Sequence, residues 1–336
     1  MKNVLLRLRS TPFLAGLLLL LALLVIFSLS LMQGSVSLTW QQFSQALLRE
    51  GDPRYQIIVW DLRLPRVMAA MVVGSALGLS GALLQGMLRN GLASPFLLGI
   101  SAGSGLAAVA ILGLGIWQIW LPLGAWLGGV ATIVVVYFLA RTGTGISVER
   151  LILGGVALST LFGALQSMLL LLSPDGQAQA ALSWLIGSLN GRSWQEISVA
   201  GPSIVVSLFV GCLLARQLNV LSLGDDLAVG LGSSLMRSRI LIGAVATLLA
   251  AGAVSIAGLV GFVGLIVPHG VRLLVGTDYR LVLPFSAIGG ALVLSIADLL
   301  ARLGPTEVPV GIVTAVMGAP VFLWLLYRRR SVVGGL

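Results

Sequence analysis

Residues 13–31 read FLAGLLLLLALLVIFSLSL, a run of nineteen residues without one charged side chain. A helix needs about 20 mainly apolar residues to cross the hydrocarbon core of a bilayer. A second stretch, Leu241–Val267, continues for 27 residues without a charge. Barrel strands alternate apolar and polar residues, which these runs do not do. Membrane-spanning helices are therefore the structure that they predict.

The composition of the whole chain agrees with these runs. Of its 336 residues, 58% are hydrophobic and only 9% are charged, whereas a soluble domain has about 25% charged residues. So few charges leave too little polar surface to cover a globule in water. We expect an all-α, polytopic membrane protein with one transmembrane domain over residues 1–336.

The N-terminal run carries the basic flank of a signal peptide, because Lys2, Arg7 and Arg9 precede it. The run is nevertheless long enough to span a bilayer, and no small-residue cleavage site follows it. We interpret it as a retained first helix with its N-terminus in the cytoplasm.

Charged residues, prolines and glycines divide the chain into about ten segments of bilayer length. The third and eighth are short and interrupted by glycine or proline, so we expect them to be broken or tilted. The predicted spans are 13–31, 64–86, 93–113, 120–140, 151–171, 196–215, 238–257, 259–275, 281–301 and 309–327.

The net charge of +9 has two interpretations, nucleic-acid binding and basic cytoplasmic loops. The second is favoured, because the basic residues are scattered between apolar spans and form no patch interleaved with aromatic residues. If the N-terminus is inside, most of them fall on the cytoplasmic side, as the positive-inside rule requires, and both termini are cytoplasmic. The external exceptions are Arg49, Arg54, Arg63, Arg66, Arg192 and Arg302.

Two hydrophilic segments are too polar to span. The segment Gln33–Asp61 is predicted to be external, and its aromatic residues are typical of the headgroup level. The segment Arg216–Arg239 is predicted to be cytoplasmic. Leucines at 223, 227 and 231 recur there at helical spacing, and Gly232 is a plausible stop. This pattern predicts a short amphipathic helix that lies against something on the cytoplasmic side.

Glycine is frequent within the spans, with 43 residues in the chain. Gly74 and Gly78 are four residues apart, as are Gly99 and Gly103, a spacing that lets helices approach closely. Close packing is the favoured interpretation, and a path lining or a pivot is the alternative. Glycines recur similarly in the second and seventh spans, which fits an inverted repeat only loosely.

The side chains needed for catalysis are missing. Lys2 is the only lysine, so the chain contains no phosphate-binding P-loop. Cys212 is the only cysteine and His269 the only histidine, which excludes an internal disulfide and a histidine-rich metal site. We expect no catalytic residue, no metal and no cofactor.

Asp298 is an acidic residue near the end of a predicted span, and its role has two interpretations. It lies four residues before Arg302, so a pair on one helix face explains it. A proton relay in an ion-coupled carrier is the alternative.

Six ordered blocks, which cover nearly the whole chain, resemble the permeases of iron-siderophore and cobalamin ABC importers. One departure is Asn90-Gly91, where that family more often has Asn-Pro. The blocks are RLPRVMAA (63–70), SGALLQGMLRNGLASP (80–95), LGISAG (98–103), GFVGLIVPH (261–269), ADLLAR (297–302) and EVPVGIVTAVMGAP (307–320).

The resemblance implies a type II ABC importer permease fold, in which two ten-helix subunits, identical or related, pair around a central path. It also implies a cytoplasmic ATPase dimer and a periplasmic substrate-binding protein as partners, beside membrane lipid. The cytoplasmic segment about 216–239 then corresponds to the family's coupling helices. The coupling residues implied are Leu223, Gly224, Asp225, Asp226, Leu227, Leu231 and Gly232.

The external arginines also gain a role from the resemblance. In the family, residues at the positions of Arg63, Arg66 and Arg302 pair with acidic residues of the binding protein. A guanidinium fork suits that role because it binds a carboxylate bidentately. Snorkelling at a helix end is the alternative for the first two. A solvated turn is the alternative for Asp225 and Asp226.

The expected function is that of a non-catalytic permease in a bacterial cytoplasmic membrane, powered by a partner that hydrolyses ATP. The resemblance favours an iron-siderophore complex as substrate and leaves cobalamin and haem open. An ion-coupled secondary transporter and a membrane scaffold are the alternatives from other classes.

Overall fold

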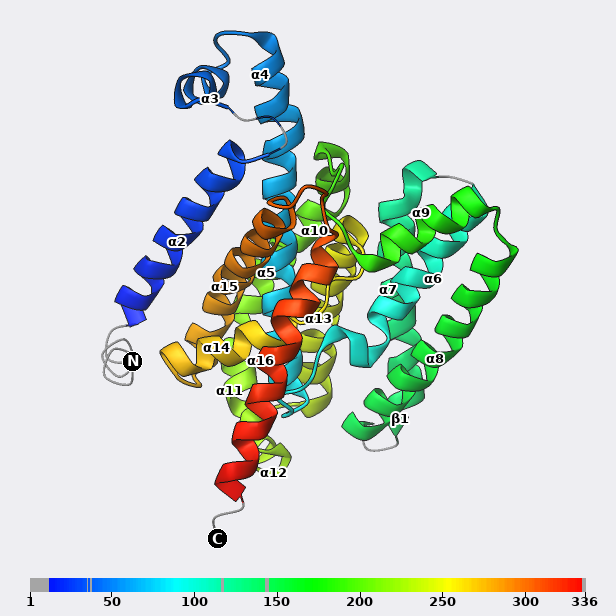
Figure 1. Ribbon diagram of the computed structural model, residues 1–336. Coiled ribbons are helices and arrows are strands. Elements are labelled where there is room, and N and C mark those ends of the chain that lie inside the picture. The colour runs from blue at the N-terminus through cyan, green and yellow to red at the C-terminus, as the bar shows by residue number, and fades with distance from the viewer. Residues whose placement is uncertain (1–11, 35, 37, 116–117, 143–144, 334–336) are drawn as a thin grey trace.

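The computed structural model describes residues 12–333 apart from residues 35, 37, 116–117 and 143–144. The basic residues Lys2, Arg7 and Arg9 lie outside the described residues. The described chain is almost entirely helical (Figure 1). Its one hairpin pairs β1 (Arg141–Thr142) with β2 (Gly145–Ile146).

Each of the ten predicted spans contains a helix, which confirms the all-α membrane fold. Seven described helices are long and apolar enough to cross a bilayer, and three shorter apolar helices accompany them. The helices are α2 (Pro12–Met32), α5 (Leu64–Met87), α6 (Ile100–Gly113), α7 (Leu121–Ala140), α8 (Val148–Leu172), α10 (Trp194–Leu213), α13 (Leu235–Ala257), α14 (Val263–Val275), α15 (Tyr279–Ala301) and α16 (Val310–Val333).

Helix α5 is the centre of the bundle, in contact with α13, α14 and α15 (Figure 1). Helix α2 stands at one edge against α15, and α6, α7 and α8 form a group at the other edge. The short helices α3 (Trp40–Leu47) and α4 (Pro53–Ile57) lie at one end of the bundle. Helix α12 (Asp225–Gly230) lies at the other end, where α2 begins and α16 ends.

Glycine lets the central helices touch backbone to backbone, as predicted for Gly74 and Gly78. A methyl group at Gly78 would overlap the carbonyl oxygen of Ser286 on α15. One at Gly81 would overlap the carbonyl oxygen of Gly264 on α14. Such close approach maximises dispersion contacts, which must hold helices together where lipid removes the hydrophobic drive.

Both spans predicted to be interrupted are broken. The third divides into the 3₁₀ turn η2 (Pro95–Leu98) and α6, and Gly99 between them has φ 75°. In the eighth, helix begins only at Val263, after Phe262 at φ 67°.

Helix begins about three turns before residue 64, the predicted start of the second span. Helix runs without a break from Pro53 to Met87, through the π-helical turn η1 (Ile58–Arg63). Pro65 lacks an amide hydrogen, and the widened turn before it, with the Leu64 amide bonded to the Val59 carbonyl, absorbs that loss. Arg63 is the last residue of this turn.

Helix α9 (Asp175–Ile186) was not predicted, because its twelve residues are too short to span a bilayer. The other connecting elements are η3 (Gln118–Trp120) and α11 (Ala215–Ser222).

Candidate functional site

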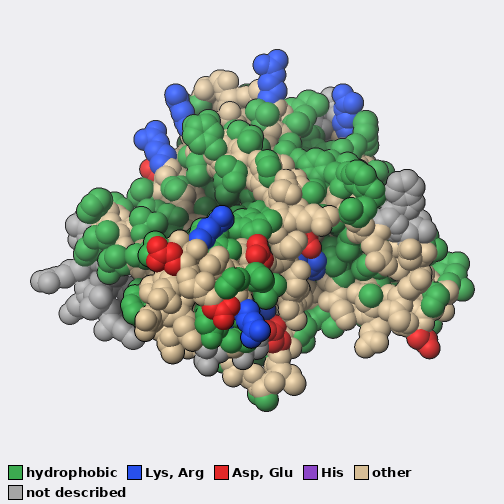
Figure 2. Space-filling model, turned by 90° about the horizontal axis from the view of Figure 1, so that it is seen from above, with side chains coloured by type: hydrophobic (Ala, Val, Ile, Leu, Met, Phe, Trp, Pro, Cys, Tyr) green, Lys and Arg blue, Asp and Glu red, His purple; other side chains and the backbone are tan. Residues whose placement is uncertain are grey.

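Three of the external arginines meet at the end of the bundle that carries α3 and α4. Arg63 ends η1, Arg66 lies in the first turn of α5, and Arg302 caps α15. Asp298 from the last turn of α15 and Glu307 from the loop before α16 join them. We call these five residues the outer cluster. Figure 2 shows acidic and basic side chains close together near the middle of this end.

The carboxylates of the outer cluster are held by two guanidinium groups. Arg66 Nε lies 3.0 Å from Asp298 Oδ1, and its Nη1 lies 2.9 Å from Glu307 Oε2. Arg302 Nη2 lies 3.1 Å from Asp298 Oδ2, which confirms the predicted i, i+4 pair. Asp298 is buried, with a side chain only 2% exposed, whereas that of Glu307 is 36% exposed.

The other guanidinium contacts fix the outer end of α2. Arg63 donates to the carbonyl oxygens of Leu31 and Met32, both at 2.8 Å, and to that of Val36. Arg302 donates to the Ser30 and Gln33 carbonyl oxygens at 3.2 Å. These carbonyls end a helix without partners of their own, so the cations also complement the helix dipole.

A cavity of about 270 Å³ opens between the outer cluster and the start of α10. Arg192 lines it from the other side, and burial lowers the pKa of this guanidinium from its ordinary value. Burial likewise lowers the pKa of Arg302, against the opposite effect of Asp298. An arginine stays protonated at neutral pH even after such a shift, so both side chains present positive charge to this cavity.

The sequence placed Arg63, Arg66 and Arg302 correctly at one end of the molecule, but their burial was not predicted. Arg63 is 6% and Arg66 is 9% exposed. Their partners lie within this chain, so docking of a binding protein at these residues stays a prediction. The carboxylate of Glu307, which the sequence analysis did not single out, is the exposed member of the outer cluster.

The predicted coupling segment forms the opposite end of the bundle. The prediction of one helix that begins at Leu223 is wrong, because Gly224, at φ 111°, separates α11 from α12. Gly232, at φ 79°, does stop α12 as expected. Its amide donates to the Val229 carbonyl at 2.8 Å and the Ser233 amide to that of Ala228 at 2.9 Å, a Schellman cap.

The coupling segment presents apolar side chains to its surroundings. Leu223, Leu227, Val229 and Leu231 are all more than half exposed, and within residues 223–232 only Ala228 is buried. Such a patch on a polar segment is typical of a surface that another protein covers.

Asp225 and Asp226 take different roles. Asp225 pairs with Arg239 at 2.8 Å and with Arg89 at 3.3 Å, which ties α12 to α13 and to the end of α5. Asp226 is exposed and has no ion-pair partner among the described residues. The first is thus an internal anchor, and the second is available to a partner.

The described residues contain no cluster of metal-binding side chains and no pair of cysteines. No group of three or more His, Cys, Asp or Glu among them is placed to hold a metal ion. Cys212, half-buried on α10, has no second cysteine to pair with. The molecule is a polytopic helical bundle with a charged cluster at one end and an apolar segment at the other.

Comparison with known proteins gives this bundle a family. Residues 20–328 match the FecCD transport family. The chain is 39% identical to the hemin transport system permease protein HmuU of Yersinia pestis, over 93% of this chain and 95% of that protein. It is 43% identical to the cobalamin import system permease protein BtuC of Halobacterium salinarum, over 85% and 78%.

A solved structure agrees with the sequence comparison. A chain described as a metal-chelate type ABC transporter in an inward-facing conformation superposes with a TM-score of 0.82 at 33% identity, over 92% of this chain and 97% of that one.

The chain therefore belongs to the FecCD transport family, whose members are permease subunits of ABC importers. It is a multi-pass membrane protein and not an enzyme, since ATP is hydrolysed in such importers by a separate subunit. An importer of this kind implies an ATPase and a substrate-binding protein as partners.

Proposed function

We propose that this chain conducts a bulky iron chelate, an iron-siderophore complex, inward across a bacterial cytoplasmic membrane. The observation that carries the proposal is the pair of surfaces at opposite ends of one helical bundle, the outer cluster and the coupling segment. Both named relatives, the hemin and the cobalamin permease, support a metal chelate as cargo. A non-haem iron chelate is favoured because two relatives at 39% and 40% identity are named as Fe(3+)-citrate and Fe(3+) dicitrate permeases. Cobalamin and haem are the alternatives.

In the proposed cycle, the binding protein delivers the chelate at the outer cluster, and an ATPase pair seats under α12. ATP closes the ATPase pair, which moves the coupling segment and biases the bundle between two packings. The tie between Asp225, Arg89 and Arg239 gives α12 a rigid connection to α5 and α13. A second permease, identical or related, completes the path.

The proposed orientation places α12 and both termini in the cytoplasm. Arg89, Arg216 and Arg237 follow or precede helices at the α12 end, which supports this orientation under the positive-inside rule.

Uptake assays test the cargo. Cells that lack this gene are supplied with radioactive iron as a siderophore complex, with hemin or with labelled cobalamin. We expect loss of siderophore-iron uptake alone, restored by the wild-type gene. Loss of hemin or cobalamin uptake alone would replace the proposed substrate, and normal uptake of all three would support a scaffold.

Two variants test the coupling role. Leu227→Asp removes an exposed apolar contact that folding does not use, so we expect purified ATPase to bind at least tenfold more weakly. Asp226→Asn is the milder companion, because it removes only a solvated charge. Undiminished ATPase binding to Leu227→Asp would contradict the proposed surface.

Docking at the outer cluster is tested best through Glu307, because substitutions of the buried arginines would also unfold their helix ends. Glu307→Gln removes the ion pair between Glu307 and Arg66 Nη1 but keeps the arginine. If a binding-protein carboxylate competes for Arg66, the variant binds that protein more tightly, and the gain shrinks with added salt. Asp226→Asn at the opposite end is the control, and weaker binding by Glu307→Gln would contradict docking at Arg66.

The ion-coupled alternative loses support from the outer cluster. Asp298 lies between two cations that belong to the same chain. A carboxylate held in this way is a structural ion pair, whereas a proton carrier must exchange its partner during each cycle.

A further inference from the structure

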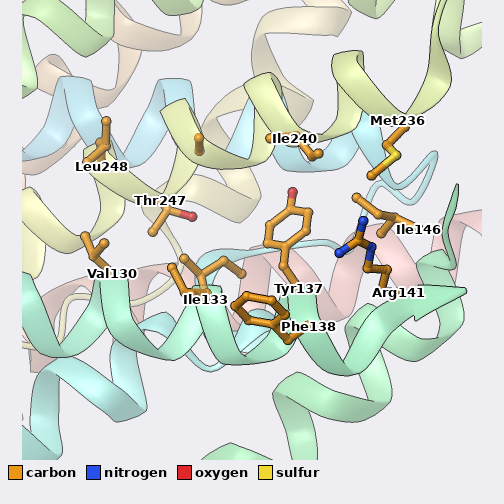
Figure 3. A pocket seen from close by; sticks show the side chains of 12 residues that line it. Val130, Ile133, Tyr137, Phe138, Arg141, Ile146, Met236, Ile240, Thr247 and Leu248 are labelled. Carbon is orange, nitrogen blue, oxygen red and sulfur yellow. The ribbon is translucent and has the colours of Figure 1, made fainter.

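An apolar groove runs between α7 and α13, remote from the outer cluster. Its volume is about 520 Å³, and Figure 3 shows its two walls facing each other. Helix α7 contributes Val130, Ile133 and Phe138, and α13 contributes Met236, Ile240 and Leu248. Arg141, at the end of α7, lies at one end of the groove beside Ile146 (Figure 3).

The length of the groove matches one leaflet. Its lining extends over twelve residues along α7 and its C-cap, from Val130 to Arg141, and over thirteen residues of α13, from Met236 to Leu248. At 1.5 Å per residue, these spans are about 16–18 Å long. One leaflet of hydrocarbon is about 15 Å thick. The groove thus reaches from the middle of the bilayer to its surface at the α12 end.

The polar groups in the walls are already satisfied. Tyr137 donates its hydroxyl hydrogen to the Arg239 carbonyl at 2.9 Å. Thr247 donates to the Gly243 carbonyl at 2.7 Å. Neither hydroxyl therefore requires a partner from a ligand, and the groove offers an occupant only apolar contact along its length.

Arg141 is the exception, and it lies where a lipid headgroup would be. Its side chain is exposed, and within the described chain no carboxylate lies within ion-pair distance of it. A cation at the surface end of a leaflet-deep apolar groove complements a molecule with an apolar tail and an anionic head. Basic pockets between spanning helices bind anionic phospholipids for this reason.

We propose that this groove binds an anionic phospholipid, with one acyl chain between α7 and α13 and the phosphate on Arg141. The bound lipid also restrains the coupling segment, because the groove wall is hydrogen-bonded to that segment. Tyr137 holds the Arg239 backbone, and the Arg239 side chain holds Asp225 of α12. This inference does not rest on the identity of the cargo.

Native mass spectrometry of the detergent-purified permease tests the site, with phosphatidylglycerol and phosphatidylcholine of identical acyl chains added in turn. Wild-type protein should retain phosphatidylglycerol about fivefold better, the effect of one basic residue at a membrane surface. Arg141→Gln should erase that preference while it keeps the binding of both lipids. Arg216→Gln, an exposed cation of the same end on α11, should leave the preference unchanged.

A second pair of variants tests the apolar part. Ala244 is exposed within the groove, so Ala244→Phe fills it without crowding the buried core. It should cut the retention of both lipids at least fivefold, with an unchanged melting temperature. Val205→Phe, on the exposed face of α10 outside the groove, should have no effect.

Equal retention of the two lipids by the wild type would overturn the headgroup assignment. Full retention by Ala244→Phe would overturn the groove itself. A loss of subunit pairing in Ala244→Phe with unchanged lipid content would show that a second copy occupies the groove, and would also overturn the proposal.

Discussion

Asp298 neutralises two buried guanidinium groups that come from different helices. Asp298→Asn keeps the shape but leaves Arg66 and Arg302 without this charge, and breaking a buried pair in this way costs about 3–5 kcal/mol. We expect a large fall in melting temperature, followed by tryptophan fluorescence in detergent. Glu307→Gln is the matched control and should cost less, because its carboxylate is partly solvated. Normal stability with abolished uptake would instead support an ion-coupled carrier.

Asp278 makes the connection between α11 and the start of α15 sensitive to acid. Its Oδ1 accepts from the Arg280 amide at 3.0 Å and from the Asn219 side chain at 2.6 Å. These bonds, the Arg280 amide first, lower the pKa of Asp278 in the folded state. Stability from the ionised form is therefore complete above the unfolded pKa of about 3.9 and is lost as the pH falls through the folded value.

Asp278→Asn tests this pH dependence, because asparagine retains the helix cap and removes only the charge. At pH 7 the variant should melt below the wild type, and the difference should shrink as the pH falls below about 4. Melting curves at a series of pH values measure it. A difference that is constant with pH would contradict the role of the charge.

At the residue scale, the sequence could predict local pairs but not distant ones. Asp298 and Arg302 are four residues apart, so helical spacing alone predicted their contact. Arg66 and Glu307 are 241 residues apart, and only the packing of α5 against α15 brings them together. Burial of the arginines follows from that packing. Sorting the charges by membrane side therefore predicted the end of the molecule at which the arginines lie, but not the groups that they contact.

At the element scale, glycine divides into positions that touch a neighbour and positions that do not. Gly81→Ala forces a methyl group into the Gly264 backbone on α14, so we expect a loss of about 1–3 kcal/mol. Gly163→Ala on α8 is the control, because nothing lies within 4 Å of the added methyl group. It should stabilise its helix by up to about 1 kcal/mol. Equal melting temperatures for the two variants would contradict the close approach of α5 and α14.

Elements were predictable where their length was fixed by the bilayer and less so elsewhere. Every predicted span contains a described helix, and seven of these helices are long enough to cross a bilayer, because about 20 apolar residues are a strong signal. Helix α9 is shorter than that signal, and the π turn before α5 responds to a single proline. The break at Gly224 was missed because the leucine spacing continues across it, although the backbone there has φ 111°.

At the scale of the whole molecule, burial separates central helices from peripheral ones. The spans of α5 and α13 are 78% buried, whereas that of α8 is only 6% buried. The hydrophobic pattern of a span that is apolar all round does not show which face meets protein, so this order was not predictable from sequence. The groove between α7 and α13 was not predictable from the sequence for the same reason.

The exposed faces of α8 and α16 leave room for the second permease that the family resemblance implies. Cys212 is the only cysteine, so Cys212→Ser gives a background for single cysteines. Leu165→Cys on α8 and Val316→Cys on α16 replace exposed side chains, and we expect each to form crosslinked permease pairs in native membranes. Val205→Cys on α10 replaces a side chain whose exposure lies between those of Leu165 and Val316, and it should form no crosslinked pair. A dimer band from Val205→Cys alone, resolved by non-reducing gel electrophoresis, would place the pairing surface on α10 and contradict pairing through α8 and α16.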